Sequence, residues 1–122
     1  MNNISKPKAG EGTTLWLVKI ILGGLVIAFL VLHFIVNHLI APGGLLNYQA
    51  VLDYYSNPII PIIEGLFLIV VIAHCLLGVR SVILDLNPSK RLLKILDIVF
   101  VLGGSIAVGY GIWLLVILTA RT

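Results

Sequence analysis

The apolar stretch 58–84, PIIPIIEGLFLIVVIAHCLLGVRSVIL, decides the fold, because it is longer than the about 20 residues with which an α-helix spans a bilayer. Two further apolar runs flank it, at 15–41 and 92–120. Hydrophobic residues make up 60% of the chain and charged residues 11%, and the mean hydropathy is +1.15. This composition is typical of a membrane protein and excludes a soluble domain.

The three runs predict an all-α membrane protein with three transmembrane helices. The expected segments are a tail at 1–14, helices at 15–41, 58–86 and 92–120, an outer loop at 42–57 and a cytoplasmic turn at 87–91. The outer loop lies between proline and glycine breakers and carries tyrosines that suit the headgroup layer, namely Tyr48, Tyr54 and Tyr55. The first run is too long for a secretory signal and shows no cleavage pattern, so we expect it to stay in the membrane.

Basic residues predict the orientation. They are Lys6, Lys8 and Lys19 at the front of the chain and Lys90, Arg91 and Lys94 around the second connection. The outer loop has none, so the N-terminus is expected in the cytoplasm and the C-terminus outside. The tail lacks the arginine-rich pattern of an organelle transit peptide, which favours a prokaryotic cell membrane. The net charge of +3 follows from this topology and gives no indication of nucleic-acid binding.

Two histidines lie deep in the predicted helices, where an ionisable group costs at least about 2.5 kcal/mol. His74 is expected about 24 Å from the outer membrane surface and His33 about 12 Å from it. Imidazole is the usual axial ligand of b-type haem, and the two axial nitrogens of one iron lie about 4 Å apart. The difference in depth therefore favours two irons, each with a second ligand from another subunit. The alternative is a neutral imidazole hydrogen-bonded to a neighbouring helix.

A strip of small and polar residues follows His74 on its helix. Asp85 comes almost three turns later and shares its face, with Gly78 and Ser81 between them. A ring bound by His74 would rest on this strip. Arg80 lies to one side, where it meets either a haem propionate or a lipid phosphate.

The remaining polar groups have simpler explanations. His38 is expected among the headgroups, and Glu64 is expected to reach water or a partner in the loop. Asp97 follows Lys94 by one turn near a helix N-terminus, where a negative charge is stabilised. Small residues recur every four positions in the third helix, and they serve either close helix packing or the seating of a flat ring: Gly103, Ala107 and Gly111.

The run HCLLGVRSVILD, residues 74–85, resembles the second helix of the small membrane-anchor subunit of succinate dehydrogenase, respiratory complex II. The run LHFIVNHLI, residues 32–40, is similar to the first helix of that subunit in the forms that carry two haems. The resemblance covers about residues 15–120. It implies a cytochrome b subunit that anchors a flavoprotein subunit and an iron–sulfur subunit. With a second membrane-anchor subunit it would form a helix bundle that binds haem b and ubiquinone or menaquinone.

On the matching positions, the resemblance implies that His74 ligates the haem nearer the cytoplasm and His33 the outer one. It places Asp85, with Ser81, beside the quinone. Leu86 stands where the family usually has tyrosine, so a phenolic hydrogen bond to quinone from that position is absent. Succinate oxidation is not expected of this chain, which has no nucleotide-binding loop and no cysteine set for clusters.

Two other functions compete with this one. The first is a small proton-coupled transporter in which Glu64, His74 and Asp85 form a proton relay. The second is an anchor cytochrome b of another redox complex.

Overall fold

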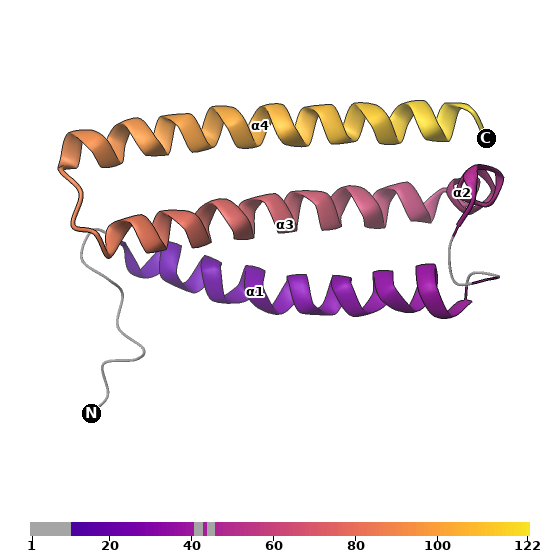
Figure 1. Ribbon diagram of the computed structural model, residues 1–122, viewed down its shortest axis with the longest axis horizontal. Coiled ribbons are helices and arrows are strands. Elements are labelled where there is room, and N and C mark those ends of the chain that lie inside the picture. The colour runs from indigo at the N-terminus through magenta and orange to yellow at the C-terminus, as the bar shows by residue number, and fades with distance from the viewer. Residues whose placement is uncertain (1–10, 41–42, 44–45) are drawn as a thin grey trace.

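The computed structural model describes residues 11–40, 43 and 46–122, and these residues form helices and short connections (Figure 1). The elements are α1 (Thr13–Phe34), the π-helix η2 (Ile35–Ile40), α2 (Tyr48–Tyr55), α3 (Ile59–Leu84) and α4 (Lys90–Ala120). Three segments are long and apolar enough to cross a membrane: Thr13–Ile40, α3 and α4. The prediction of an all-α fold with three membrane-spanning helices is confirmed. The tail residues 1–10, with Lys6 and Lys8, lie outside the described residues.

The three long helices lie side by side in one layer, with α3 in the middle (Figure 1). No described Cα atom of α1 lies within 8 Å of one of α4, so α3 alone joins the two outer helices. We call the end with η2 and α2 the outer end and the opposite end the cytoplasmic end, after the orientation that the basic residues predict.

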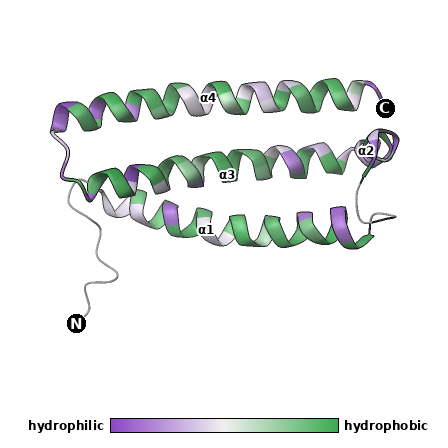
Figure 2. Ribbon diagram, viewed as in Figure 1, coloured by the Kyte–Doolittle hydropathy of each residue, from purple (hydrophilic) through white to green (hydrophobic). Residues whose placement is uncertain are grey.

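A layer one helix thick leaves apolar side chains uncovered along its length. Figure 2 shows that the three long helices are mostly hydrophobic. Leu84 is the one buried hydrophobic side chain of the described residues, whereas Ile106 is 72% exposed. Such a surface requires lipid or further helices around it.

Local capping sets the turn between α3 and α4. α3 ends at Leu84, before the expected residue 86, and Asn87 adopts the left-handed conformation with φ 50°. Asparagine is among the few residues that adopt this conformation readily. α4 begins at Lys90, before the expected residue 92, because the Ser89 side chain accepts a hydrogen bond from the Leu92 backbone N–H at 3.2 Å.

The outer connection, expected to be a loop, contains the helix α2. The side chain of Asn47 caps α2 by accepting a hydrogen bond from the Ala50 backbone N–H at 2.8 Å. α2 lies across the outer ends of α3 and α4 (Figure 1), where Arg121 Nη1 donates to the Tyr48 hydroxyl at 3.5 Å. Pro42 and Gly44, the breakers that open the expected loop, lie outside the described residues.

Glycines bring α4 close to α3. A Cβ atom added to Gly104 would lie 2.7 Å from Leu76 Cδ1, and one added to Gly111 would collide with Leu68. A Cβ atom at Gly104 would have to move only the end of the Leu76 side chain, whereas one at Gly111 would also crowd Leu68 Cγ, so the close approach depends more on Gly111.

The expected stripe of Gly103, Ala107 and Gly111 is only partly right. A Cβ atom on Gly103 would meet nothing within 4 Å, and Ala107 is exposed. The contact positions are Gly104 and Gly111, which are two turns apart, and of the three expected residues Gly111 alone is one of them. Close helix packing is therefore the role that the structure shows for Gly111.

We expect the substitution Gly111→Leu to destabilise the helix layer by about 1–3 kcal/mol, because the new side chain competes with Leu68 for the same space. Gly103→Leu is the matched control on the same helix, and its expected effect on the isolated chain is within about 0.5 kcal/mol. Thermal unfolding of both variants in detergent measures the difference. Equal melting temperatures for the two variants would contradict the assigned contact.

Candidate functional site

His74 lies in the middle of α3, on the side that faces α1. A Cβ atom added to Gly23 of α1 would lie 3.5 Å from His74 Cε1 and 3.9 Å from Nδ1. Nδ1 is buried and has no hydrogen-bond partner within the described part of the chain. A buried nitrogen without a partner costs about 1–3 kcal/mol. The hydrogen bond to a neighbouring helix that would explain His74 as a structural residue is thus not formed by Nδ1.

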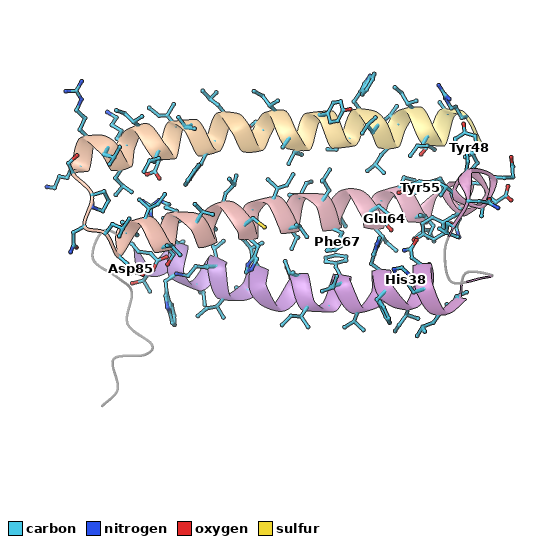
Figure 3. All side chains as sticks on the ribbon, in the orientation of Figure 1. His38, Tyr48, Tyr55, Glu64, Phe67 and Asp85 are labelled. Atoms are coloured by element: carbon cyan, nitrogen blue, oxygen red, sulfur yellow. The ribbon has the colours of Figure 1, made fainter. Side chains whose placement is uncertain are left out.

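His33 belongs to a polar cluster at the outer end. Its Nδ1 lies 3.4 Å from Glu64 Oε1 on α3, and the Tyr54 hydroxyl of α2 donates to the same oxygen at 3.1 Å. Asn37 in η2 places Nδ2 3.3 Å from His33 Nδ1 and donates to the His33 carbonyl oxygen at 2.9 Å. Glu64 therefore has a partner in the outer connection, Tyr54, as expected. Its second contact, with His33, is not predicted from the sequence. Figure 3 shows Glu64 at this end of α3.

The Glu64 carboxylate changes the chemistry of both tyrosines in α2. Burial, together with the nearby negative charge of Glu64, raises the pKa of Tyr54 to about 12. Burial and then the same charge also raise the pKa of Tyr55 above its ordinary value. The Tyr54 hydroxyl is therefore a neutral hydrogen-bond donor throughout the physiological pH range.

Aromatic rings fill the α1–α3 contact between the two histidine levels. The ring centroids of His33 and Phe67 are 5.6 Å apart, and those of Phe67 and Phe29 are 5.8 Å apart. Phe67 lies between the two helices in Figure 3.

The contacts of the two histidines set their relative depth. His33 lies opposite Glu64 and Phe67 of α3, whereas His74 itself is on α3, opposite Gly23 of α1. At 1.5 Å per residue the two levels are about 10–15 Å apart. The depth difference expected from the sequence is present, and it is too large for the two rings to share one iron.

Arg80 forms an ion pair across the α3–α4 contact. Its Nε donates to Asp97 Oδ1 at 2.7 Å and its Nη2 to Asp97 Oδ2 at 3.3 Å. A haem propionate or a lipid phosphate is the predicted partner of Arg80, and Lys94 is the predicted neighbour of Asp97. The structure joins Arg80 to Asp97, a pair that neither prediction includes.

Ser81 is buried in the contact between α3 and α1. Its Oγ accepts a hydrogen bond from Lys19 Nζ at 3.0 Å, and Lys19 also binds Glu11 Oε1 at 2.8 Å. Lys19 contributes to the predicted orientation of the chain, whereas its contact with Ser81 is not predicted from the sequence. Asp85 follows the end of α3 and is exposed at the cytoplasmic end (Figure 3). Beside Gly78 there is open space, since a Cβ atom there would meet nothing within 4 Å.

A groove of about 850 Å³ runs between α3 and α4. Its lining is mostly apolar, with Arg80 and Asp97 among the polar residues. His74 does not line this groove. The histidines and the groove therefore belong to different helix contacts, α1–α3 and α3–α4.

The surroundings of His74 can be tested against a cofactor that needs one ligand from this chain. The described residues contain no group of three or more His, Cys, Asp or Glu side chains that could hold a metal ion. A single imidazole with a buried, unpartnered Nδ1 suits an axial ligand of a haem iron whose other axial ligand comes from elsewhere. Open space beside Gly78, one turn from His74, is compatible with a flat ring.

The chain matches a known protein family. The family model described as succinate dehydrogenase/fumarate reductase transmembrane subunit matches residues 2–109. The succinate dehydrogenase hydrophobic membrane anchor subunit of Archaeoglobus fulgidus is 30% identical over 100 residues, which cover 82% of this chain and 85% of that protein. No solved structure matches the chain.

We expect Arg80→Leu and Asp97→Leu each to lower the free energy of unfolding by about 1–3 kcal/mol, because each leaves one charge without its partner. The loss is smaller than for a fully buried pair, since the Asp97 side chain is 43% exposed. The double variant should lose less than the sum of the two, which thermal unfolding of all four proteins measures as a double-mutant cycle. Additive losses would show that the two groups do not depend on each other.

Proposed function

The chain belongs to the family of succinate dehydrogenase/fumarate reductase transmembrane subunits, and from this premise we propose that it binds haem b and passes electrons to membrane quinone. It is a multi-pass membrane-anchor subunit of an oxidoreductase complex. The chemistry of succinate belongs to other subunits in this proposal, and the present chain supplies the membrane part of the electron route.

The observation that carries the proposal is the state of His74. A deep imidazole with a buried Nδ1 and no partner for it is costly unless the ring has another use. Coordination of an iron by this imidazole would give the ring that use. Haem, when bound, supplies one-electron chemistry, because its iron alternates between the ferric and ferrous states.

His33 would hold a second haem, nearer the outside. Its depth, about 10–15 Å from that of His74, supports separate irons. A partner subunit would supply the other protein ligand of each iron. Arg80 would contact a propionate or a lipid phosphate only through Nη1, since Nε and Nη2 bind Asp97.

Quinone would be reduced at the cytoplasmic end of the α1–α3 contact. Reduction of a quinone to a quinol takes up two protons, and the exposed carboxylate of Asp85 can relay them from water. Ser81 Oγ and Lys19 Nζ offer hydrogen-bond donors to a quinone carbonyl in the same region. Leu86 offers none, so a tyrosine for this purpose would come from another subunit.

The flat layer indicates where partners would bind. The basic cytoplasmic end would anchor the flavoprotein and iron–sulfur subunits, and a second membrane-anchor subunit would cover one face of the layer. Lipid would cover the remaining surface, and no nucleic-acid partner is proposed. The archaeal relative supports a prokaryotic cell membrane as the location.

The competing functions have less support. In the transporter hypothesis Glu64, His74 and Asp85 form a relay, but Glu64 contacts His33 and Tyr54. The relay groups are about 15 Å apart along α3, well beyond a hydrogen bond. Membership of the succinate dehydrogenase/fumarate reductase family argues against the anchor of another redox complex.

We expect His74→Ala to remove one haem from the purified complex, because the axial ligand is lost. Reduced-minus-oxidised spectra and a pyridine haemochrome assay measure the haem content. His38→Ala, in η2 at the outer end, serves as the control and should keep all haem. Unchanged haem content in His74→Ala, in a complex that otherwise assembles, would contradict the proposal.

We expect Asp85→Asn to lower the rate of quinone reduction by about 100-fold, which is the lower range for loss of a general acid or base. Succinate oxidation measured with a soluble dye acceptor should stay unchanged, because that route bypasses the membrane. Asp53→Asn, an exposed carboxylate at the outer end, is the matched control. Equal losses with quinone and dye would instead indicate a defect in assembly.

A further inference from the structure

We propose that Glu64 is a positioning residue for His33: its carboxylate keeps the ring hydrogen on Nδ1 and thereby leaves Nε2 as the nitrogen that binds iron. This inference rests on the proposed ligation of haem by His33. Glu64 lies inside a membrane-spanning helix, and its hydrogen bond to the outer connection does not by itself require a carboxylate there. Positioning of His33 gives this carboxylate a function.

The Glu64 carboxylate needs hydrogen-bond donors. The side chain is 14% exposed and lies in α3, where an unpaired carboxylate is costly. The Tyr54 hydroxyl donates to Oε1 at 3.1 Å, and His33 Nδ1 lies 3.4 Å from the same atom. The ring nitrogen is therefore the second group placed to serve this oxygen.

The contact between His33 Nδ1 and Glu64 Oε1 is long for a hydrogen bond. A charge-assisted N–H···O bond is about 2.7–2.9 Å long, so the contact of 3.4 Å is looser than a formed bond. Hydrogen bonds at functional sites are often long before the ligand binds and shorten afterwards. Ligation of Nε2 makes the Nδ1 hydrogen more acidic, which strengthens its attraction to the carboxylate.

The His33 ring has two neutral tautomers, with the hydrogen on Nδ1 or on Nε2. Asn37 Nδ2 lies 3.3 Å from His33 Nδ1 and would donate to it if the hydrogen were on Nε2, and that tautomer cannot bind iron through Nε2. The Asn37 amide has two N–H groups, and one of them donates to the His33 carbonyl oxygen at 2.9 Å. The negative charge of Glu64, 3.4 Å from Nδ1, attracts a hydrogen on that nitrogen, and a hydrogen bond to a carboxylate, once formed, is about twice as strong as one between neutral groups. The Glu64 contact therefore favours the tautomer with the hydrogen on Nδ1.

The two histidines then differ in their electronic properties. A carboxylate behind His33 makes the imidazole a stronger electron donor and stabilises the ferric state of its iron. Nδ1 of His74 has no such partner among the described residues. Glu64 should thus lower the reduction potential of one haem and leave the other unaffected.

The test is a redox titration of both haems in the complete complex purified from native membranes, with low-spin electron paramagnetic resonance spectra as a second readout. In Glu64→Gln the haem that His33→Ala removes should become easier to reduce. At a fixed ambient potential its ferrous-to-ferric ratio should rise roughly tenfold, or about 59 mV for one electron. The haem that His74→Ala removes should not change, and Asp53→Asn should change neither.

Further variants distinguish a failure of the proposed role of Glu64 from a failure of the proposed ligation by His33. Tyr54→Phe removes the competing donor to Oε1, so the same haem should become harder to reduce, and this variant decides the matter if Glu64→Gln does not assemble. Unchanged potentials in these variants would overturn the role of Glu64 while the proposed ligation stands. A shift in Asn37→Ala without one in Glu64→Gln would support the other tautomer and overturn the inference. Full haem content in His33→Ala would overturn the ligation itself.

Discussion

The high cost of an unpaired polar group in hydrocarbon organises this molecule. The described spans meet that cost by pairing polar side chains across helix contacts. Glu64 takes contacts from α1 and α2, Arg80 binds Asp97 of α4, and Lys19 of α1 binds Ser81. Among the buried side-chain nitrogen and oxygen atoms of these spans, His74 Nδ1 alone has no partner. The one exception to the pairing is therefore the residue that most needs a functional explanation.

The flat arrangement of the helices gives these pairs their importance. Since α1 and α4 do not approach each other, each contacts the rest of the layer mainly through α3, and a central core is absent from the described residues. Close packing at Gly104 and Gly111 holds α4, while the ion pair of Arg80 and Asp97 fixes its register on α3. The stability of such a layer depends on what covers its two faces, so it belongs to the assembled complex more than to the single chain.

The sequence was sufficient for the spans and insufficient for the contacts between them. Length and hydropathy locate the three long helices, and the polar positions identify His33 and His74 as the unusual residues. α2 was missed because a helix of two turns between breakers has no apolar period long enough to recognise. Gly103 was chosen instead of Gly104 because neighbouring residues point 100° apart, and spacing within one helix does not tell which face meets α3.

The pairing of Arg80 with Asp97 was missed for a related reason, since it joins residues 17 positions apart on different helices. With this pair assigned to the α3–α4 contact, the two helix contacts of α3 differ in the groups that they hold. The α3–α4 contact holds packing glycines and an ion pair, and neither histidine faces its groove. The α1–α3 contact is tied at the outer end by Glu64 and at the cytoplasmic end by Lys19 and Ser81. Between these ties a glycine faces His74, so the ends maintain the spacing that a ligating ring in the middle would need.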